Sequence, residues 1–202
     1  MIRKYVTIII CIILCATITA NAQYFKGGLL FGLTGSQMDG DQMTGYNKLG
    51  ITTGFFIRND FSNKIAVQTD FKYIMKGAAT FITNNSNGGY SQTLHYAEIP
   101  AFICFRISKK LECETGLAAA MLLYDTKNIT GEDVITGNGI KPYDFSSIFG
   151  FTYLYTEKLN VNLKLSYSLK AISYNWPTNQ TLLGLTGQFN NVLELAVYYK
   201  LR

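Results

Sequence analysis

The sequence of 202 residues is poor in histidine, proline and cysteine, and these shortages exclude several classes of structure and function. His95 is the only histidine, which excludes a metal centre built on several histidines. No apolar run after residue 22 is long enough for a transmembrane helix. The net charge of +5 is small and evenly spread, so no nucleic-acid partner is expected. Three prolines and an excess of Tyr, Phe, Gly, Thr and Asn favour strands.

The beginning of the chain, residues 1–22, has the three parts of a cleavable secretory signal. Two basic residues open it, residues 5–19 form an apolar run, and Ala20-Asn21-Ala22 is a small-x-small exit. A membrane anchor is the alternative, but the run is short and no positive charges follow it. Lipid attachment at Cys15 is disfavoured because a leucine precedes it. We therefore expect cleavage after Ala22 and one domain over residues 23–202.

Alternation of apolar and polar residues is the dominant signal in that domain. Over Leu159–Lys170, every second residue is Leu, Val or Tyr, and the intervening residues are Asn, Lys and Ser. Because successive strand side chains point to opposite faces, such a segment is a two-faced strand. The same pattern predicts eight strands, over residues 24–36, 48–60, 65–77, 93–107, 111–124, 143–155, 159–174 and 188–201. A tilted membrane-crossing strand needs roughly nine to eleven residues, and these segments are long enough with residues to spare.

The connections between these segments alternate strictly between short and long. Tight turns are expected at 61–64, 108–110 and 156–158, and long polar loops at 37–47, 78–92, 125–142 and 175–187. Outer-membrane barrels combine short periplasmic turns, longer extracellular loops and an even number of strands. A lipocalin or a β-sandwich also has alternating strands, but nothing in either requires this rhythm. The sequence therefore predicts an all-β fold, an eight-stranded antiparallel up-and-down transmembrane β-barrel.

Two features favour lipid rather than water around this barrel. The polar faces are rich in small neutral residues, which suit a narrow interior. Aromatic residues also gather near the segment ends, as in the interfacial girdles of membrane barrels. They are Tyr24, Phe25, Phe55, Phe56, Tyr96, Tyr124, Tyr143, Tyr153, Tyr155, Tyr174, Tyr198 and Tyr199. The alternative fold is a soluble periplasmic barrel with its apolar faces inward, since aromatic residues are also good strand formers.

Three short pieces of the chain resemble one family. Gln68–Ala78 is similar to that family's third strand, which closes on Lys-Gly. His95–Pro100 is similar to its Tyr-x-Glu-Ile-Pro signature, and Lys26–Phe31 to its glycine-rich first strand. On these pieces the chain is identified as a member of the PorT-like outer-membrane β-barrel group, abundant in the Bacteroidota. The resemblance implies an integral outer-membrane protein, and it implies no particular role there.

Charged residues on the polar faces form the candidate site of the barrel interior. Lys76 and Glu98 lie on the polar faces of adjacent strands, so we expect them to form an ion pair. Burying either charge without a partner would be costly. Eight further residues would extend this pair into a network: Asp70, Lys72, Arg106, Glu112, Glu114, Lys164, Lys170 and Glu194. Eight strands leave an interior only wide enough for side chains, so the expected role is structural. Pro100, which lacks a ladder donor, predicts a β-bulge.

Candidate enzymatic and metal sites have weaker support. Ser91, His95 and Glu98 are residue types of a lipid-modifying enzyme, but His95 and Glu98 have opposite parity and would face opposite sides. Residues 38–42, Met-Asp-Gly-Asp-Gln, resemble the start of a calcium loop but lack the further ligands and the closing glutamate. We expect no catalytic residue, no cofactor and no metal.

Cys104 and Cys113 flank the turn at 108–110, and export makes a disulfide chemically feasible. A two-residue turn would place the cysteines opposite each other. A three-residue turn keeps Glu112 and Arg106 on compatible faces and points the cysteines to opposite sides. We favour the second register and unpaired cysteines.

The long loops hold whatever specific recognition the protein has, because loops on rigid scaffolds are the usual places of binding. We expect a structural or interaction barrel in outer-membrane lipid that binds an envelope protein or a surface ligand through these loops. Transport of small solutes is the alternative, although wide channels come from about sixteen strands. An outer-membrane lipid-modifying enzyme is the third hypothesis, and it is disfavoured because no set of catalytic residues is found on one face.

Overall fold

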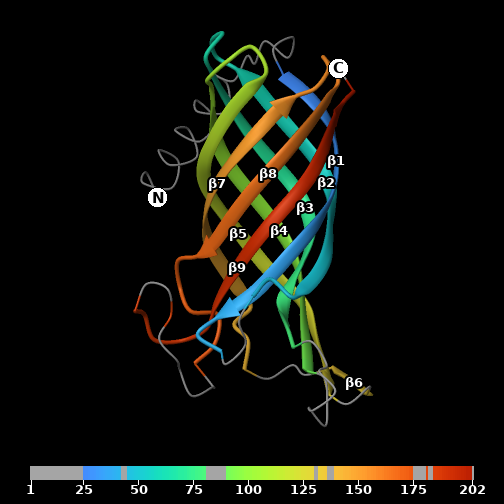
Figure 1. Cartoon of the computed structure of the whole chain (residues 1–202), viewed down its shortest axis with the longest axis vertical. Coiled ribbons are helices and arrows are strands. Elements are labelled where there is room, and N and C mark those ends of the chain that lie inside the picture. Colours follow the sequence, from blue (N-terminus) through green and yellow to red (C-terminus); the bar gives the residue numbers. More distant parts are fainter. Residues whose placement is uncertain are drawn as a thin grey trace, which may run out of the picture.

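The computed structural model describes residues 25–41, 45–80, 90–129, 132–135, 139–174, 181 and 184–201, with the backbone alone for 129 and 132–135. The predicted signal, Tyr24 and most residues of the long loops lie outside these ranges. The described residues form nine strands (Figure 1): β1 (Phe25–Asp39), β2 (Lys48–Asp60), β3 (Ile65–Ala79), β4 (Tyr90–Arg106), β5 (Leu111–Ile129), β6 (Glu132–Ile135), β7 (Tyr143–Leu154), β8 (Leu159–Ser168) and β9 (Phe189–Lys200).

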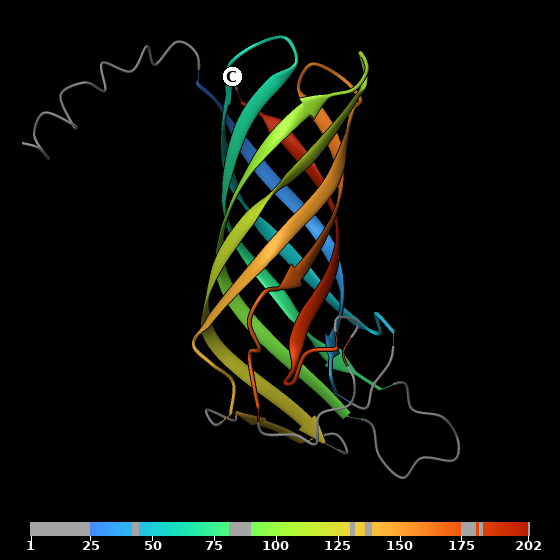
Figure 2. The ribbon, with the colours of Figure 1, turned by 90° about the vertical axis from the view of Figure 1, so that its left-hand side faces the viewer.

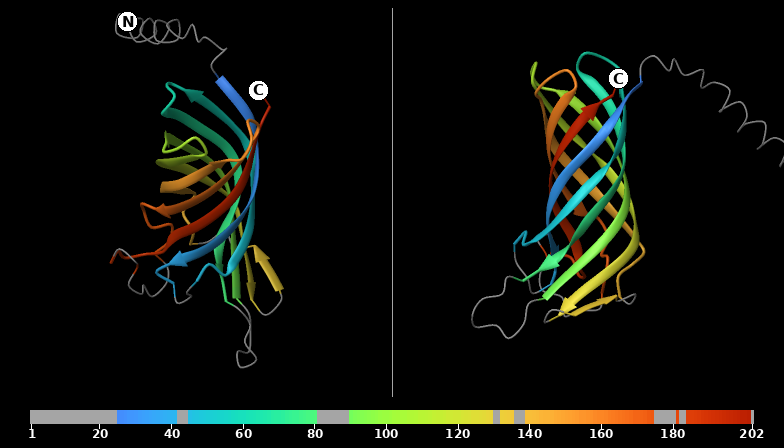
Figure 3. Two further views of the ribbon diagram at one scale, coloured as in Figure 1. Left: turned by 45° about the horizontal axis from the view of Figure 1, so that its top comes forward. Right: turned by 90° about the vertical axis from the view of Figure 1, so that its right-hand side faces the viewer.

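Eight of the nine strands close into one barrel, and every pairing is antiparallel. The strand order is β4-β3-β2-β1-β9-β8-β7-β5, and the pairing of β4 with β5 completes the ring. The short turns and the end of β9 lie at one end of the barrel, and the strand ends that lead into the long connections lie at the other (Figures 2 and 3). The predicted up-and-down barrel of eight membrane-length strands is therefore confirmed.

The two faces of each strand differ as the alternation predicts. Outward side chains are large and apolar, and Phe31 and Leu117 each expose 60% of their surface. Inward side chains are mostly polar, and Asp70, Asn162 and Lys164 are all buried. A soluble barrel has the reverse arrangement, so this distribution indicates a barrel surrounded by lipid. None of the described residues forms a helix long and apolar enough to cross a membrane.

The predicted strand ends are wrong at the long-loop end, where the sheet is longer than the alternation indicates. β4 begins at Tyr90 rather than residue 93, and β5 continues to Ile129 rather than residue 124. β6 adds a short strand inside the predicted loop 125–142 and pairs with the end of β5 (Figure 1). Backbone N–H and C=O groups pair whatever the side chains are, so a ladder can continue where the alternation has stopped.

β8 shows the opposite error, because it ends at Ser168 rather than at residue 174. After it the chain crosses the barrel mouth, where Ala171 and Ile172 are buried, and only an isolated bridge joins Ser173 to Gln188. Lys170, predicted to face the interior, is instead exposed and lies over the outward ring of Phe145, 5.9 Å from its centroid.

The bulge predicted at Pro100 is absent from that position. Pro100 keeps its register with Ala118 of β5, and toward β3 the ladder is interrupted without an inserted residue. The missing N–H of proline therefore removes ladder bonds and does not change the register. The register shift lies at His95/Tyr96, opposite Leu123 of β5.

Three of the aromatic residues assigned to interfacial girdles belong to the interior. Phe56, Tyr96 and Tyr198 are each no more than 4% exposed. Gly28 lies opposite Phe56, and a Cβ on Gly28 would come within 2.5 Å of the Phe56 ring, so the glycine leaves the space that the ring fills. The other described members of the set are exposed, as residues of an interfacial girdle would be: Phe25, Phe55, Tyr124, Tyr143, Tyr153, Tyr155, Tyr174 and Tyr199.

Candidate functional site

Ten buried charged side chains of the barrel interior are here called the lumen network: Arg58, Asp70, Lys72, Lys76, Glu98, Glu112, Glu114, Asp144, Lys164 and Glu194; Asp125, nearer the long-loop end of β5, is a further buried carboxylate. Strand alternation turns them all inward, and they occur on all the barrel strands except β1. Four are basic and six are acidic, so carboxylates are in excess.

At the short-turn end, Arg58 of β2 forms a bidentate pair with Glu112 of β5. Its Nη1 and Nη2 donate to the two carboxylate oxygens at 2.7 and 2.9 Å. Arg106 donates to Glu112 as well, and Asp60 accepts from Arg58 at 2.7 Å. Two parallel N–H···O bonds are the strongest and most directional form of an ion pair. This group therefore ties β2 to β5, which are not neighbours in the sheet.

Lys164 of β8 is the centre of the next group. Its Nζ lies 3.5 Å from Asp70 Oδ2 on β3 and 3.4 Å from Glu114 Oε1 on β5. Tyr198 donates to Asp70 at 2.7 Å, and Asn162 donates to Glu114 at 2.9 Å. Each buried charge thus has charged and neutral partners, which offset the cost of removing it from water.

Further toward the long loops, Lys72 and Lys76 share one carboxylate. Lys72 Nζ lies 2.5 Å from Glu194 Oε2 and 3.3 Å from Glu98 Oε1. Lys76 Nζ lies 2.7 Å from Glu98 Oε2 and 3.0 Å from Asp144 Oδ2. Asp144 also accepts hydrogen bonds from Ser168 and from Asn190, so β3, β4, β7, β8 and β9 are joined at this level.

An apolar cluster closes the interior beyond the lumen network. It contains Met38, Ile74, Ala78, Leu94, Tyr96, Ala120, Ile172 and Val192. Ile172 comes from the segment that follows β8, and Ile140 packs against the cluster from the connection before β7. The sequence did not predict this cluster, because several of its members lie on strand faces that are otherwise polar, or in segments predicted to be loops.

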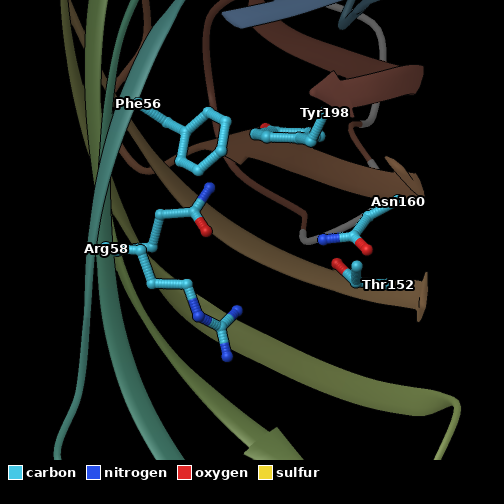
Figure 4. Close-up of a pocket in the computed structure, with 6 residues that line it drawn as sticks. Phe56, Arg58, Thr152, Asn160 and Tyr198 are labelled. Atoms are coloured by element: carbon cyan, nitrogen blue, oxygen red, sulfur yellow. The ribbon is translucent and has the colours of Figure 1, made fainter. Parts of the chain in front are cut away.

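A cavity inside the barrel lies at the short-turn end (Figure 4). Phe56 and Arg58 of β2, Thr152 of β7, Asn160 of β8 and Tyr198 of β9 line it, together with Gln68. It offers about 10 Å³ to the centre of a water-sized sphere, which is room for about one water molecule. Around this cavity the side chains of the described lumen therefore leave little free space, as expected for eight strands.

Sequence reasoning found much of this network and missed some of its members. Arg58 and Asp144 were missed although both have the inward parity of their strands, so parity alone could have found them. Arg106 lies at the rim, with 38% of its side chain exposed. Lys170 lies outside the barrel.

The residues of the hypothetical enzyme site are not brought together. Glu98 lies in the lumen, whereas His95 faces outward with Tyr73 and Tyr124. In the part of the chain that the structure describes, no group of three His, Cys, Asp or Glu residues has the arrangement of a metal site. Asp39 belongs to β1 rather than to a calcium-like loop, and it accepts a hydrogen bond from Tyr167 at 2.6 Å.

The two cysteines have the register that keeps Arg106 opposite Glu112. Cys104 pairs with Glu114 and is buried in the lumen, while Cys113 pairs with Phe105 and is half-buried on the other face. Both thiols are free.

The long-loop end continues past the membrane-spanning length as a small sheet of β3, β4, β5 and β6 (Figures 1 and 2). Tyr90, the seventeenth residue of β4 counted from Arg106, lies well beyond an eleven-residue crossing. Burial raises the pKa of its phenol above the usual range, and the charges of Asp41 and Asp125 act in the same direction. The described strands of this end are therefore paired beyond the membrane-crossing length.

Comparison with known proteins supports a membrane barrel. The model of the family described as outer membrane protein beta-barrel domain matches residues 20–174. No curated protein matches the sequence.

Two solved structures have a similar fold. Ail, the attachment invasion locus protein of Yersinia pestis, is 13% identical with a TM-score of 0.51, and the match covers 87% of this chain and 97% of Ail. Neisserial surface protein A is 10% identical with a TM-score of 0.53, and the match covers 87% of this chain and 96% of that protein. Ail has also been crystallised in complex with the heparin analogue sucrose octasulfate. At these identities the likeness concerns the fold alone.

Proposed function

Because the chain belongs to the outer membrane protein beta-barrel domain family, its place is the outer membrane, and we propose that it serves there as a closed barrel that binds a surface ligand or an envelope protein through its long-loop end. The lumen network carries this proposal. Its ion pairs join strands on opposite sides of the barrel, from Arg58–Glu112 to Lys76–Asp144, and the apolar cluster lies beyond them. Because these side chains occupy the lumen, we place the function of the protein on its outer surface and loops.

The arrangement of the two ends supports recognition at the long loops. In outer-membrane barrels the longer connections face the outside of the cell and the short turns face the periplasm. The sheet of β3–β6 extends this end and provides a folded support for loops 37–47, 78–92, 125–142 and 175–187. Ail, a barrel of similar fold, forms a complex with a heparin analogue, which is compatible with ligand binding on such a scaffold.

The proposal has three further parts. Residues 1–22 direct export and are removed after Ala22, which leaves residues 23–202 as the barrel domain. The chain is a PorT-like member of its family, as the sequence around Lys76 and Glu98 indicates. Lys76 and Glu98 hold the barrel closed, and they have no catalytic role.

Site-specific photo-cross-linking in living cells tests recognition at the long-loop end. A photoreactive residue replaces Tyr174 or Leu185 near the long loops, and Phe61 or Tyr155 in the short turns serves as the matched control; all four are exposed. We expect a discrete cross-linked product from the long-loop positions and none from the controls. Products from both ends alike, or from the short turns alone, would contradict the proposal.

A further inference from the structure

The short-turn end of the barrel carries four lysines, here called the basic rim: Lys64, Lys109, Lys110 and Lys158. Each of the three short turns contributes at least one of them, and all four are exposed. None of the four forms an ion pair with another residue in the part of the chain that the structure describes. Their charges are therefore available to an acidic partner outside the protein.

The basic rim is distributed around the barrel and is not confined to one side. Its turns join β2 to β3, β4 to β5 and β7 to β8, pairs that follow one another around the closed sheet. The fourth position of this end, where β1 begins and β9 ends, has two further lysines, Lys26, which pairs with Asp60, and Lys200. Figures 2 and 3 show these turns and the end of β9 at the same end of the barrel. A partner that engages the whole basic rim must therefore surround the barrel.

The opposite end of the barrel has the opposite charge. Five acidic and two basic residues occur in the long connections at 37–47, 78–92, 125–142 and 175–187. The three short turns contain the four lysines and one acidic residue, Glu157. A surface that serves only solubility carries both signs interspersed. The separation of charge between the two ends indicates that the short-turn end contacts an acidic surface.

Exposed apolar side chains lie among the lysines of this end. Phe61, Ile107 and Tyr155 belong to the same three connections, and Leu201 follows Lys200; each of the four exposes between 59% and 68% of its surface. Lysines beside aromatic and aliphatic side chains are typical of the border between hydrocarbon and water, where the apolar parts are buried and the ammonium groups reach the headgroups. A soluble acidic molecule would leave these apolar side chains in water, so the composition favours a lipid surface.

The basic rim also lies at the edge of the lipid-facing wall. Ile65 follows Lys64 directly, and Phe105 and Tyr153 are outward residues shortly before the other two turns. Because the turns are tight, each lysine is within a few residues of this wall. The short turns of outer-membrane barrels face the periplasm, so the adjacent leaflet is the inner leaflet of the outer membrane.

We propose that the basic rim binds anionic phospholipids in the inner leaflet of the outer membrane. The lysine ammonium groups donate to the phosphate oxygens of the headgroups, and the apolar side chains between the lysines pack against the adjoining acyl chains. Lipids surround the barrel, as the distribution of the lysines requires, whereas one small soluble anion would contact only part of it. This interaction goes beyond recognition at the long-loop end and does not depend on it.

Native mass spectrometry of the protein extracted folded from outer membranes tests the basic rim. The probes are phosphatidylglycerol, phosphatidylcholine with the same acyl chains, and glycerophosphoglycerol, which is the anionic headgroup without chains. We expect phosphatidylglycerol to bind about fivefold more tightly than phosphatidylcholine, since one lysine near an anionic lipid surface gives a preference of roughly this size. Glycerophosphoglycerol at the same concentration should not bind, because it offers nothing to the apolar side chains of this end.

Lys109→Gln combined with Lys110→Gln should reduce the preference for phosphatidylglycerol by at least about half, and replacing all four lysines of the basic rim should remove it. Lys127→Gln combined with Lys170→Gln is the matched control, because it removes two lysines from the opposite end of the barrel. Unheated gel mobility identifies the folded fraction of each variant, and the comparison of probes on the unaltered protein stays decisive if a variant fails to fold. Equal binding of the two phospholipids, equal binding of glycerophosphoglycerol, or an equal loss in the control would overturn the proposal.

Discussion

Lys164 and Glu194 are direct partners across β8 and β9, yet neither takes the other as its nearest ionic contact. Lys164 reaches Asp70 on β3 and Glu114 on β5, while Glu194 reaches Lys72 on β3. These pairs cross the lumen, whereas others, such as Lys76–Glu98, join neighbouring strands. The pairs that cross the lumen link strands that the backbone ladder does not connect.

Arg58→Met is expected to lower the free energy of unfolding by about 3–5 kcal/mol, because it leaves Glu112 buried with only the rim residue Arg106 as a partner. The measurement is the urea midpoint of the barrel in lipid vesicles. Arg58→Met combined with Glu112→Leu should recover most of the loss, since replacing both partners by apolar groups is often nearly neutral. A double variant as unstable as the single one would contradict this account.

Lys76→Met should be similarly destabilising, by about 3–5 kcal/mol, because Glu98 and Asp144 lose the cation between them. The loss of unheated gel mobility at increasing temperature reports the change. Glu98 keeps Lys72 as a partner, so Asp144 is the carboxylate left without a cation among the described residues, and adding Asp144→Asn should restore part of the stability. An unchanged melting profile for Lys76→Met would show that this pair does not hold the barrel closed.

Glu194→Gln should cost less than about 1 kcal/mol, whereas Glu112→Gln should cost about 2–3 kcal/mol. In Glu194 only Oε2 is engaged, by Lys72, and Oε1 has no hydrogen-bond partner among the described residues, so an amide NH₂ can replace it. In Glu112 both oxygens accept from Arg58, and an amide NH₂ would face a guanidinium N–H. Urea titration of the two variants gives the comparison, and equal costs would contradict the assigned contacts.

Cys113 should react with a maleimide in the folded barrel in detergent, whereas Cys104 should react only after unfolding. Cys113 is half-buried on the outer face and Cys104 is buried in the lumen. Cys104→Ser and Cys113→Ser, each retaining one of these two thiols, separate the two rates. Rapid labelling of Cys104 in the folded protein would place it outside the lumen and contradict the register of β4 with β5.

Strand number and facing could be predicted from the sequence because lipid outside and polar packing inside impose a period of two along each strand. Parity likewise selected Lys72, Lys76 and Glu98 as inward residues. Strand ends could not be predicted in the same way. The length of β4 and β5 depends on their mutual ladder, and the early end of β8 depends on Ile172 packing over the lumen.

The register shift between β4 and β5 could not be predicted from the sequence either. The bulge opposite His95 leaves Leu123 unpaired, and Leu123 is not a proline or glycine, the residue types that would have indicated a bulge. Phe56, Tyr96 and Tyr198 were assigned to the membrane interface although parity places them inside. Their assignment rested on residue type, and the glycine that accommodates the Phe56 ring becomes evident only when β1 and β2 are aligned.

Conductance of the folded protein in a planar lipid bilayer tests the central claim most directly. With the lumen network and the apolar cluster in place, the account predicts a membrane current no greater than that of the lipid alone, without discrete steps, at every voltage the bilayer withstands. Reproducible single-channel openings from the folded protein would contradict it, and they would show that ions pass the interior that Arg58, Lys164 and Lys76 are inferred to close.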